Sequence, residues 1–297
     1  MSIAVLIGVH DGLVLAADSA STLVINVPQG GTMATNVYDN ANKIFNLIKG
    51  EPLGCVTFGS GSIGSASIAT LIKDFRKKLS VRDPKSNEFK FDIKNYNMEQ
   101  VAGLLADFLG GECQKLRPPE LTAINIGFLV GGYSSGESLG ESWSVEIKQG
   151  VPGKPLKLRE KDQPGLNWGG QAEVLQRIVL GFSPRIFPIL AQVSQPPPAS
   201  PEELMDKLGP LLASQLQAPL VFAPMPIQDA IDLGRFLVHA ATMFSRFLPG
   251  MQIVGGPIEV AAITKHEGFK WISRKHYYDQ SLNREPIHVT VDRRIED

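Results

Sequence analysis

Strand-like and helix-like patterns alternate in blocks along this 297-residue chain, and their order restricts the fold more than any other feature. Paired strands and paired helices indicate stacked layers, because a parallel βαβ sheet would alternate single elements. We therefore predict an α+β fold with two antiparallel sheets face to face and helices outside each. The apolar, β-branched strand patterns cover 3–9, 13–17, 43–48, 53–58, 123–130, 143–147, 154–158, 258–264, 270–273 and 287–291, and the helical repeats of three and four cover 62–79, 98–116, 171–181 and 227–247.

No linker or internal repeat divides the chain, so we predict a single domain over residues 1–297. A proline-rich insertion covers about 184–226, with one short helix near 202–216. Residues 28–36 carry Pro, Gly and Asn and are typical of a loop. Gly234 lies on the apolar stripe of the last helix, which indicates close approach to a neighbouring element.

The composition excludes several classes of protein. Lys and Arg number 29 and Asp and Glu 30, so no charge excess favours nucleic acid or a membrane surface. No apolar run reaches about 18 residues, and the N-terminal segment lacks the pattern of a signal peptide, so a cytoplasmic protein is expected. Cys55 and Cys113 are expected to be buried, reduced thiols. His276 and His288 have no partner at metal-ligand spacing, so neither a metal nor a cofactor is predicted.

Ser2 is the first candidate for chemistry. Removal of Met1, which occurs when the next residue is small, would leave a serine that carries both a hydroxyl and an α-amine. An α-amine with a pKa near 7.7–8.0 can accept the hydroxyl proton close to neutral pH. The apolar strand that follows would fix this terminus at the edge of a core. Serine at position 2 is also common in proteins without such chemistry.

Asp18 and Lys43 are expected to meet Ser2. His10-Asp11-Gly12 predicts a tight turn in the first hairpin, which returns the chain to Asp18 beside residue 2. Lys43 begins the next strand and would point to the same place if that strand pairs alongside. A lysine there would stabilise an anionic seryl oxygen and lower the pKa of the α-amine, and Asp18 would orient it. Each residue alone also fits an ordinary strand end.

The turn Gly59-Ser60-Gly61 precedes a helix expected to start near Ser62. Glycine-rich turns at helix N-termini present free backbone N–H groups, which suit a developing oxyanion. Such a turn is a weak signal without its neighbours.

Together these residues resemble the proteasome β-subunit family of N-terminal-nucleophile (Ntn) hydrolases, in its bacterial form. The resemblance lies in Gly12–Ser19, in Lys43-Ile44-Phe45 and in the turn at Gly59. In that family an aspartate follows the mature N-terminal threonine by sixteen positions, and Asp18 has that spacing from Ser2. Weaker similarities cover 123–130, 227–234 and Gly255-Gly256.

The resemblance implies a four-layer αββα sandwich that assembles into rings. It also implies a role for each candidate: a nucleophile, an orienting carboxylate, a charged amine, an oxyanion donor and positions along an extended substrate. The implied catalytic residues are Ser2, Asp18, Lys43 and Gly59, and the implied substrate-binding residues are Thr22 and Ser60.

The chain departs from the family pattern at several places. The nucleophile is serine, and the first loop places Lys43 about nine residues further along. Met251 and Val254 stand where the family has an Asp and a Ser, and Gln171 follows Trp168-Gly169-Gly170 where a Ser begins the third helix. These two departures remove groups that hydrogen-bond the N-terminal amine.

The sequence therefore predicts a hydrolase of amide bonds, a peptidase that forms an acyl-enzyme on Ser2. Two alternatives stay open: a catalytically inactive structural or assembly subunit, and an acylase for small amides. The expected partners are a peptide or small-amide substrate and further copies of the chain in a ring or stacked rings. No nucleic acid or membrane partner is expected, and no ATPase partner can be identified.

Overall fold

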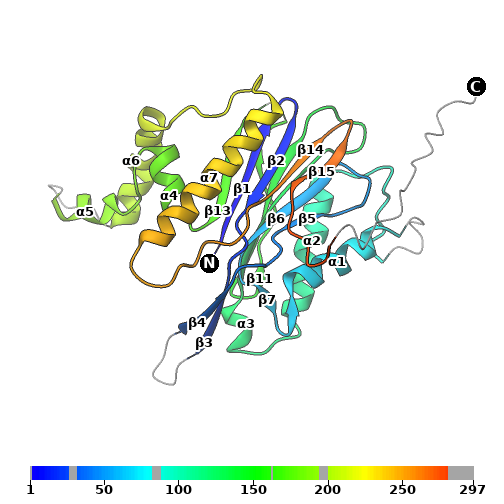
Figure 1. Cartoon of the computed structure of the whole chain (residues 1–297), viewed down its shortest axis with the longest axis horizontal. Coiled ribbons are helices and arrows are strands. Elements are labelled where there is room, and N and C mark those ends of the chain that lie inside the picture. Colours follow the sequence, from blue (N-terminus) through cyan, green and yellow to red (C-terminus); the bar gives the residue numbers. More distant parts are fainter. Residues whose placement is uncertain (1, 27–31, 82–87, 162, 194–199, 280–297) are drawn as a thin grey trace, which may run out of the picture.

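The computed structural model of this chain describes residues 2–26, 32–81, 88–161, 163–193 and 200–279. Two antiparallel sheets stack face to face, and helices cover the outer side of each (Figure 1). The structure is thus a four-layer αββα sandwich, and the predicted α+β fold class is confirmed. The division of the whole chain into one domain stays a prediction.

The first sheet has five strands in the described residues, in the order β13-β1-β2-β14-β15. Its first hairpin closes where Val9 pairs with Gly12, across the predicted turn. The strands of this sheet are β1 Ile3–Val9, β2 Gly12–Ala17, β13 Gly165–Gly170, β14 Glu259–Thr264 and β15 Gly268–Ser273.

The second sheet follows the order β11-β10-β9-β6-β5, and β12 also pairs with β10. It joins strands from the beginning and the middle of the chain, since β6 pairs with β9 along its whole length. The strands are β5 Ile44–Asn46, β6 Leu53–Gly59, β9 Asn125–Gly132, β10 Glu141–Lys148, β11 Val151–Pro152 and β12 Leu156–Arg159.

Alternation along β1 builds two cores at once. Ile3, Val5 and Ile7 face the helical side of the first sheet, and Ala4 and Leu6 face the second sheet. Successive side chains of a strand point to opposite faces, so an all-apolar strand is the pattern of a sheet buried on both sides. Because β1 is apolar on both faces, it needs a packed layer on each side: the helices on one and the second sheet on the other.

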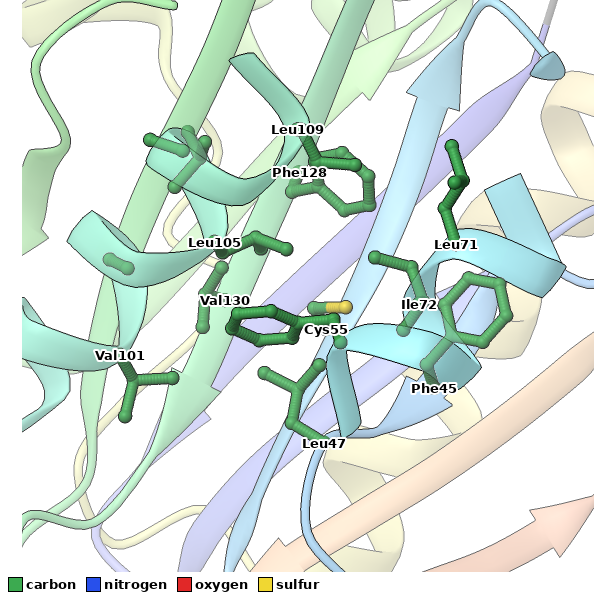
Figure 2. Packing of buried hydrophobic residues seen from close by; sticks show 14 of the residues in the cluster. Phe45, Leu47, Cys55, Leu71, Ile72, Val101, Leu105, Leu109, Phe128 and Val130 are labelled. Carbon is green, nitrogen blue, oxygen red and sulfur yellow. The ribbon is translucent and has the colours of Figure 1, made fainter. Parts of the chain in front are cut away.

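Helices α1 Ile68–Leu79 and α2 Met98–Cys113 cover the outer face of the second sheet. Figure 2 shows their apolar side chains packed on this sheet, with Ile72 and Leu105 on either side of Cys55. Cys55 and Cys113 are both buried free thiols, as expected. Figure 1 shows the short α3, Glu120–Ala123, below these helices.

Helix α7, Ile227–Phe247, crosses the outer face of the first sheet (Figure 1). A Cβ added at Gly234 would lie 3.3 Å from the Cβ of Ala16 and 3.5 Å from Val14. The close approach predicted at Gly234 is therefore confirmed.

Part of the predicted loop 28–36 is a strand. Strands β3 Ser21–Asn26 and β4 Thr32–Tyr38 form an antiparallel ribbon that projects from the body (Figure 1). The strand-forming residues of 21–25 find a pairing partner in a segment whose own Pro, Gly and Asn content indicated a loop. The prediction was wrong for 32–36, because backbone pairing outweighed local composition.

Residues 165–181 also differ from the prediction. Trp168-Gly169-Gly170 belongs to strand β13, which was not among the predicted strands, and β13 pairs with β1 over six positions. The glycines are needed there because a Cβ at Gly169 would lie 2.2 Å from the ring of Phe58. The predicted helix is present as α4 Glu173–Leu175 and the π-helical turn η1 Gln176–Leu180.

The insertion holds two helices, not one, in its described part. Helix α6, Pro201–Leu216, matches the predicted one, and α5, Ile186–Val193, was not expected. The three consecutive prolines at 196–198, the predicted strand 287–291, His288 and Met1 lie outside the described residues.

Candidate active site

Asp18 follows the last residue of β2 and lies beside the start of β1. The register of the first hairpin pairs Ala4 with Ala17, and the backbone N–H of Asp18 donates to the carbonyl of Ile3 at 3.4 Å. The hairpin therefore places the carboxylate next to the residue that follows Ser2.

The Asp18 carboxylate is completely buried and accepts four hydrogen bonds. Its Oδ1 accepts from the backbone N–H of Ile3 at 2.9 Å and from Nζ of Lys43 at 2.5 Å. Its Oδ2 accepts from the backbone N–H groups of Ala20 and Gly255, both at 3.1 Å. Hydrogen bonds of this kind stabilise a buried carboxylate in its charged form.

Lys43 is buried just before β5, where the second sheet meets the end of β2. The predicted strand 43–48 is shorter, so Lys43 reaches the site from a connecting segment and not from within a strand. Burial lowers the pKa of the Lys43 ammonium, and the charge of Asp18 and its hydrogen bond oppose this effect. Nearby Lys275 lowers the pKa further, and Glu259 raises it.

Ser2 is 5 % exposed and is fixed through its backbone. Its carbonyl accepts from the backbone N–H of Gln171 at 2.7 Å, at the end of β13. Gly170 adopts φ +92°, and a Cβ there would lie 1.9 Å from the Ser2 carbonyl oxygen. Only glycine allows this approach, so the glycine-rich β13 sets the position of Ser2.

Gly59 ends β6 in a left-handed conformation, with φ +94°. The backbone N–H and hydroxyl of Ser60 donate to the Asn125 carbonyl at 2.8 and 3.0 Å, and the Ser60 hydroxyl accepts from the Asn125 N–H at 3.1 Å. These bonds hold the turn against β9.

The helix expected to begin near Ser62 begins at Ile68. A small hairpin, β7 Ser62–Ile63 and β8 Ala66–Ser67, lies between the Gly59 turn and α1, whose N-terminus is capped by Ser67. The prediction that the turn leads directly into a helix was wrong, because Ser62 and Ile63 pair back on Ser67 and Ala66 first. Any oxyanion donation by Gly59 would therefore lack the dipole of α1.

Thr22 lies in β3, where it pairs with Val37 of β4. Pairing with β4 therefore occupies one edge of β3. This is the strand that we expected to align an extended substrate. Ser19 and Ala20 connect this ribbon to Asp18. The backbone N–H of Ser19 donates to the carbonyl of Gly255 at 2.8 Å.

Two charged residues at this site were missed by the sequence analysis. Glu259 is 1 % exposed and forms an ion pair with Lys275 at 2.7 Å. Lys275 also donates to Oγ of Ser19 at 2.8 Å, and Ser19 Oγ donates to the carbonyl of Pro257 at 2.6 Å. The only signal for this pair in the sequence was a glutamate at the start of the apolar run 259–263.

Met251 and Val254 stand where the proteasome β-subunit family has an Asp and a Ser. Val254 is buried and Met251 is exposed. Both side chains are apolar, so neither offers a polar group to the N-terminus. Gly255, next to Val254, reaches Asp18 through its backbone N–H instead. Within the described ranges, no three His, Cys, Asp or Glu side chains converge to hold a metal ion.

Comparison with known proteins identifies solved structures that resemble this chain. No protein-family model matches the chain, and neither does any curated protein. The Gly-1 mutant of Anbu from Hyphomicrobium sp. strain MC1 has a TM-score of 0.52 and 15 % identity, over 95 % of this chain and 92 % of that chain. This chain shares the Anbu fold. Anbu (ancestral beta-subunit) from Yersinia bercovieri is 14 % identical, with a TM-score of 0.45 over 92 % of this chain and 88 % of that chain.

These comparisons correct the resemblance to the bacterial proteasome β-subunit family. That assignment was wrong, because no family model matches the chain and the similar structure is an Anbu protein at 15 % identity. The spacing of Ser2 and Asp18 follows from the register of the first hairpin, and Lys43 comes from the segment just before β5, so this spacing does not single out one family. At this identity the likeness establishes the fold alone.

None of the helices in the described residues combines the length and the apolar character that a bilayer crossing requires.

Proposed function

We propose that this chain hydrolyses amide bonds with Ser2 as an N-terminal nucleophile, after removal of Met1. The supporting observation is the buried Asp18 carboxylate, whose Oδ1 contacts both the N–H of Ile3 and the Nζ of Lys43. A buried lysine–aspartate pair beside an N-terminal serine places fixed charge where a seryl oxygen becomes anionic.

In the proposed reaction, Oγ of Ser2 adds to the substrate carbonyl carbon as the α-amine of Ser2 accepts the hydroxyl proton. The tetrahedral intermediate then expels the substrate amine, which takes that proton and leaves an ester on Ser2. Water, deprotonated by the same α-amine, hydrolyses the ester and regenerates the hydroxyl. Lys43 supplies positive charge, Asp18 orients it, and the backbone N–H of Gly59 donates to the oxyanion.

The substrate in this proposal is a peptide, and it lies along β3 at Thr22, beside Ser60. An acylase acting on a small amide uses the same steps, so substrate length separates the two: hydrolysis of short acyl amides but not of peptides identifies the acylase. The proposed assembly is a ring of identical subunits, which sedimentation of the full chain tests.

An inactive assembly subunit is the second candidate. It is favoured by Val254 and Met251, which offer no polar side chain to the N-terminal amine. It predicts the same fold and assembly with no reaction at Ser2.

The deciding experiment is intact-mass analysis before and after treatment with an electrophile that bonds both the hydroxyl and the α-amine of an N-terminal serine. Loss of Met1 and one stoichiometric adduct, absent in Ser2→Ala but retained in the exposed-serine control Ser65→Ala, would support the hydrolase. Retained Met1, or a free Ser2 that forms no adduct, would overturn it and leave the assembly subunit.

A further inference from the structure

A large basic cleft lies beside the proposed catalytic residues. Its volume is about 770 Å³, and it is bounded by β5, by α1, by β15 and by the segment 274–278. Small-molecule sites have volumes of roughly 300–1,000 Å³, so the cleft has the size of a ligand site. Ser2, Asp18 and Lys43 do not line it.

Five Lys or Arg side chains and a single carboxylate line the cleft, in a chain whose formal net charge is −1. The one carboxylate among the lining residues, Glu259, is already paired with Lys275. The other basic side chains form no ion pair within the described part of the chain. They are Lys49, Lys73, Arg76 and Arg274.

The arginines show that this charge is locally uncompensated. Burial lowers the pKa of Arg76, and the nearby positive charge of Arg274 lowers it further. Within the part of the chain that the structure describes, the hydrogen bond of Arg76 is a long one, to the Asn46 carbonyl at 3.5 Å. Like charges held together without counter-ions raise the local concentration of anions, and guanidinium groups match the geometry of phosphate oxygens.

Aromatic side chains line the same cleft. The guanidinium of Arg274 lies over the ring of Trp271, 4.9 Å from its centroid, and Phe269 packs edge-on against Trp271. Tyr277 is 97 % exposed and stands edge-on to Tyr278, with ring centroids 5.0 Å apart. An exposed ring next to converging cations offers a stacking surface for a planar group that carries anionic charge.

We propose that this cleft binds a nucleotide-class ligand, an aromatic base joined to two or more phosphates. Arg76 and Arg274 hold the phosphates with help from Lys49 and Lys73, and the base stacks at the rim on Tyr277. This site is separate from the amide hydrolysis proposed at Ser2, and its test does not require that Met1 be removed.

Calorimetric titration of the full chain at low ionic strength tests this site with four probes: ATP, AMP, inorganic tripolyphosphate and adenosine. We expect ATP to bind most tightly, AMP and tripolyphosphate more weakly, and adenosine not at all. Arg76→Ala and Arg274→Ala should each raise the Kd for ATP about tenfold, the scale of one charge-assisted contact. Tyr277→Ala should raise the Kd for ATP and leave that for tripolyphosphate unchanged.

Lys77→Ala is the matched control, because Lys77 is an exposed basic residue on α1 that does not line the cleft. Equal weakening by Lys77→Ala would mean unspecific attraction and overturn the site. Absence of binding by both ATP and tripolyphosphate up to about 1 mM would also overturn it. Tripolyphosphate binding as tightly as ATP, with no effect of Tyr277→Ala, would overturn the nucleotide assignment in favour of an inorganic polyphosphate. Unchanged thermal unfolding of each variant shows that a loss of binding is local.

Discussion

Asp18 and Lys43 form a buried ion pair that joins the two sheets of the sandwich. Asp18 follows β2 of the first sheet, Lys43 precedes β5 of the second, and Oδ1 lies 2.5 Å from Nζ. Three backbone N–H groups complete the surroundings of the carboxylate. The pair thus ties the proposed reaction site to the packing of the layers.

Replacement of Lys43 by Met should destabilise the fold, because it leaves the Asp18 carboxylate charged and buried without its counter-ion. Loss of one partner of a buried pair costs about 3–5 kcal/mol. Urea unfolding followed by circular dichroism measures this loss. The exposed pair Lys115–Glu112 provides the control, since Lys115→Met should change the free energy of unfolding only slightly. A Lys43→Met variant as stable as this control would show that the pair does not contribute to stability.

Lys43 should also give the stability a characteristic pH dependence. Burial lowers its pKa in the folded state below the ordinary 10.5, while the unfolded chain keeps the ordinary value. Between these two values the unfolded chain binds more protons, so the free energy of unfolding contributed by Lys43 rises with pH through this window. Urea unfolding at several pH values up to 10.5 should therefore show the parent chain gaining stability relative to Lys43→Met. A constant difference across the window would contradict the lowered pKa.

Gly170→Ala should disturb the position of Ser2. The residue has φ +92°, and its new Cβ would overlap the Ser2 carbonyl oxygen. We expect a loss of about 2 kcal/mol or more, in the range of strained backbone conformations. Thermal unfolding measures it.

Gly103→Ala is the matched control for this change, because Gly103 lies in α2 with open space around its Cα. It should raise the stability by about 0.4–1 kcal/mol, since alanine is the better helix former. Equal effects of the two substitutions would mean that the close contact at Gly170 is relieved at little cost.

The two cysteines should be inert in the folded protein. Burial raises the pKa of both thiols, and the reactive thiolate is therefore scarce at neutral pH. A chromogenic disulfide reagent should detect almost no thiol under native conditions and two per chain in guanidinium chloride. Rapid reaction of either cysteine in the native protein would contradict its place in the core.

Much of the fold follows from local patterns. The limits of β1, from Ile3 to Val9, and of α7, from Ile227 to Phe247, agree with the sequence prediction. Both are long and strongly patterned, so packing and propensity favour the same structure. The glycine-rich β13 and the loop-like start of β4 were missed, since β13 exists through pairing with β1, far along the chain, and β4 through pairing with β3.

By itself, the sequence determined that the chain forms layered sheets and helices, and that Asp18 returns to the neighbourhood of Ser2, because a hairpin has a fixed register. Only the tertiary structure decided that Lys43 reaches Asp18 from the other sheet, that Glu259 and Lys275 lie beside them, and that basic residues from α1 and the segment after β15 line one cleft. These relationships join residues far apart in the chain, and they depend on how the layers pack, which no local pattern encodes.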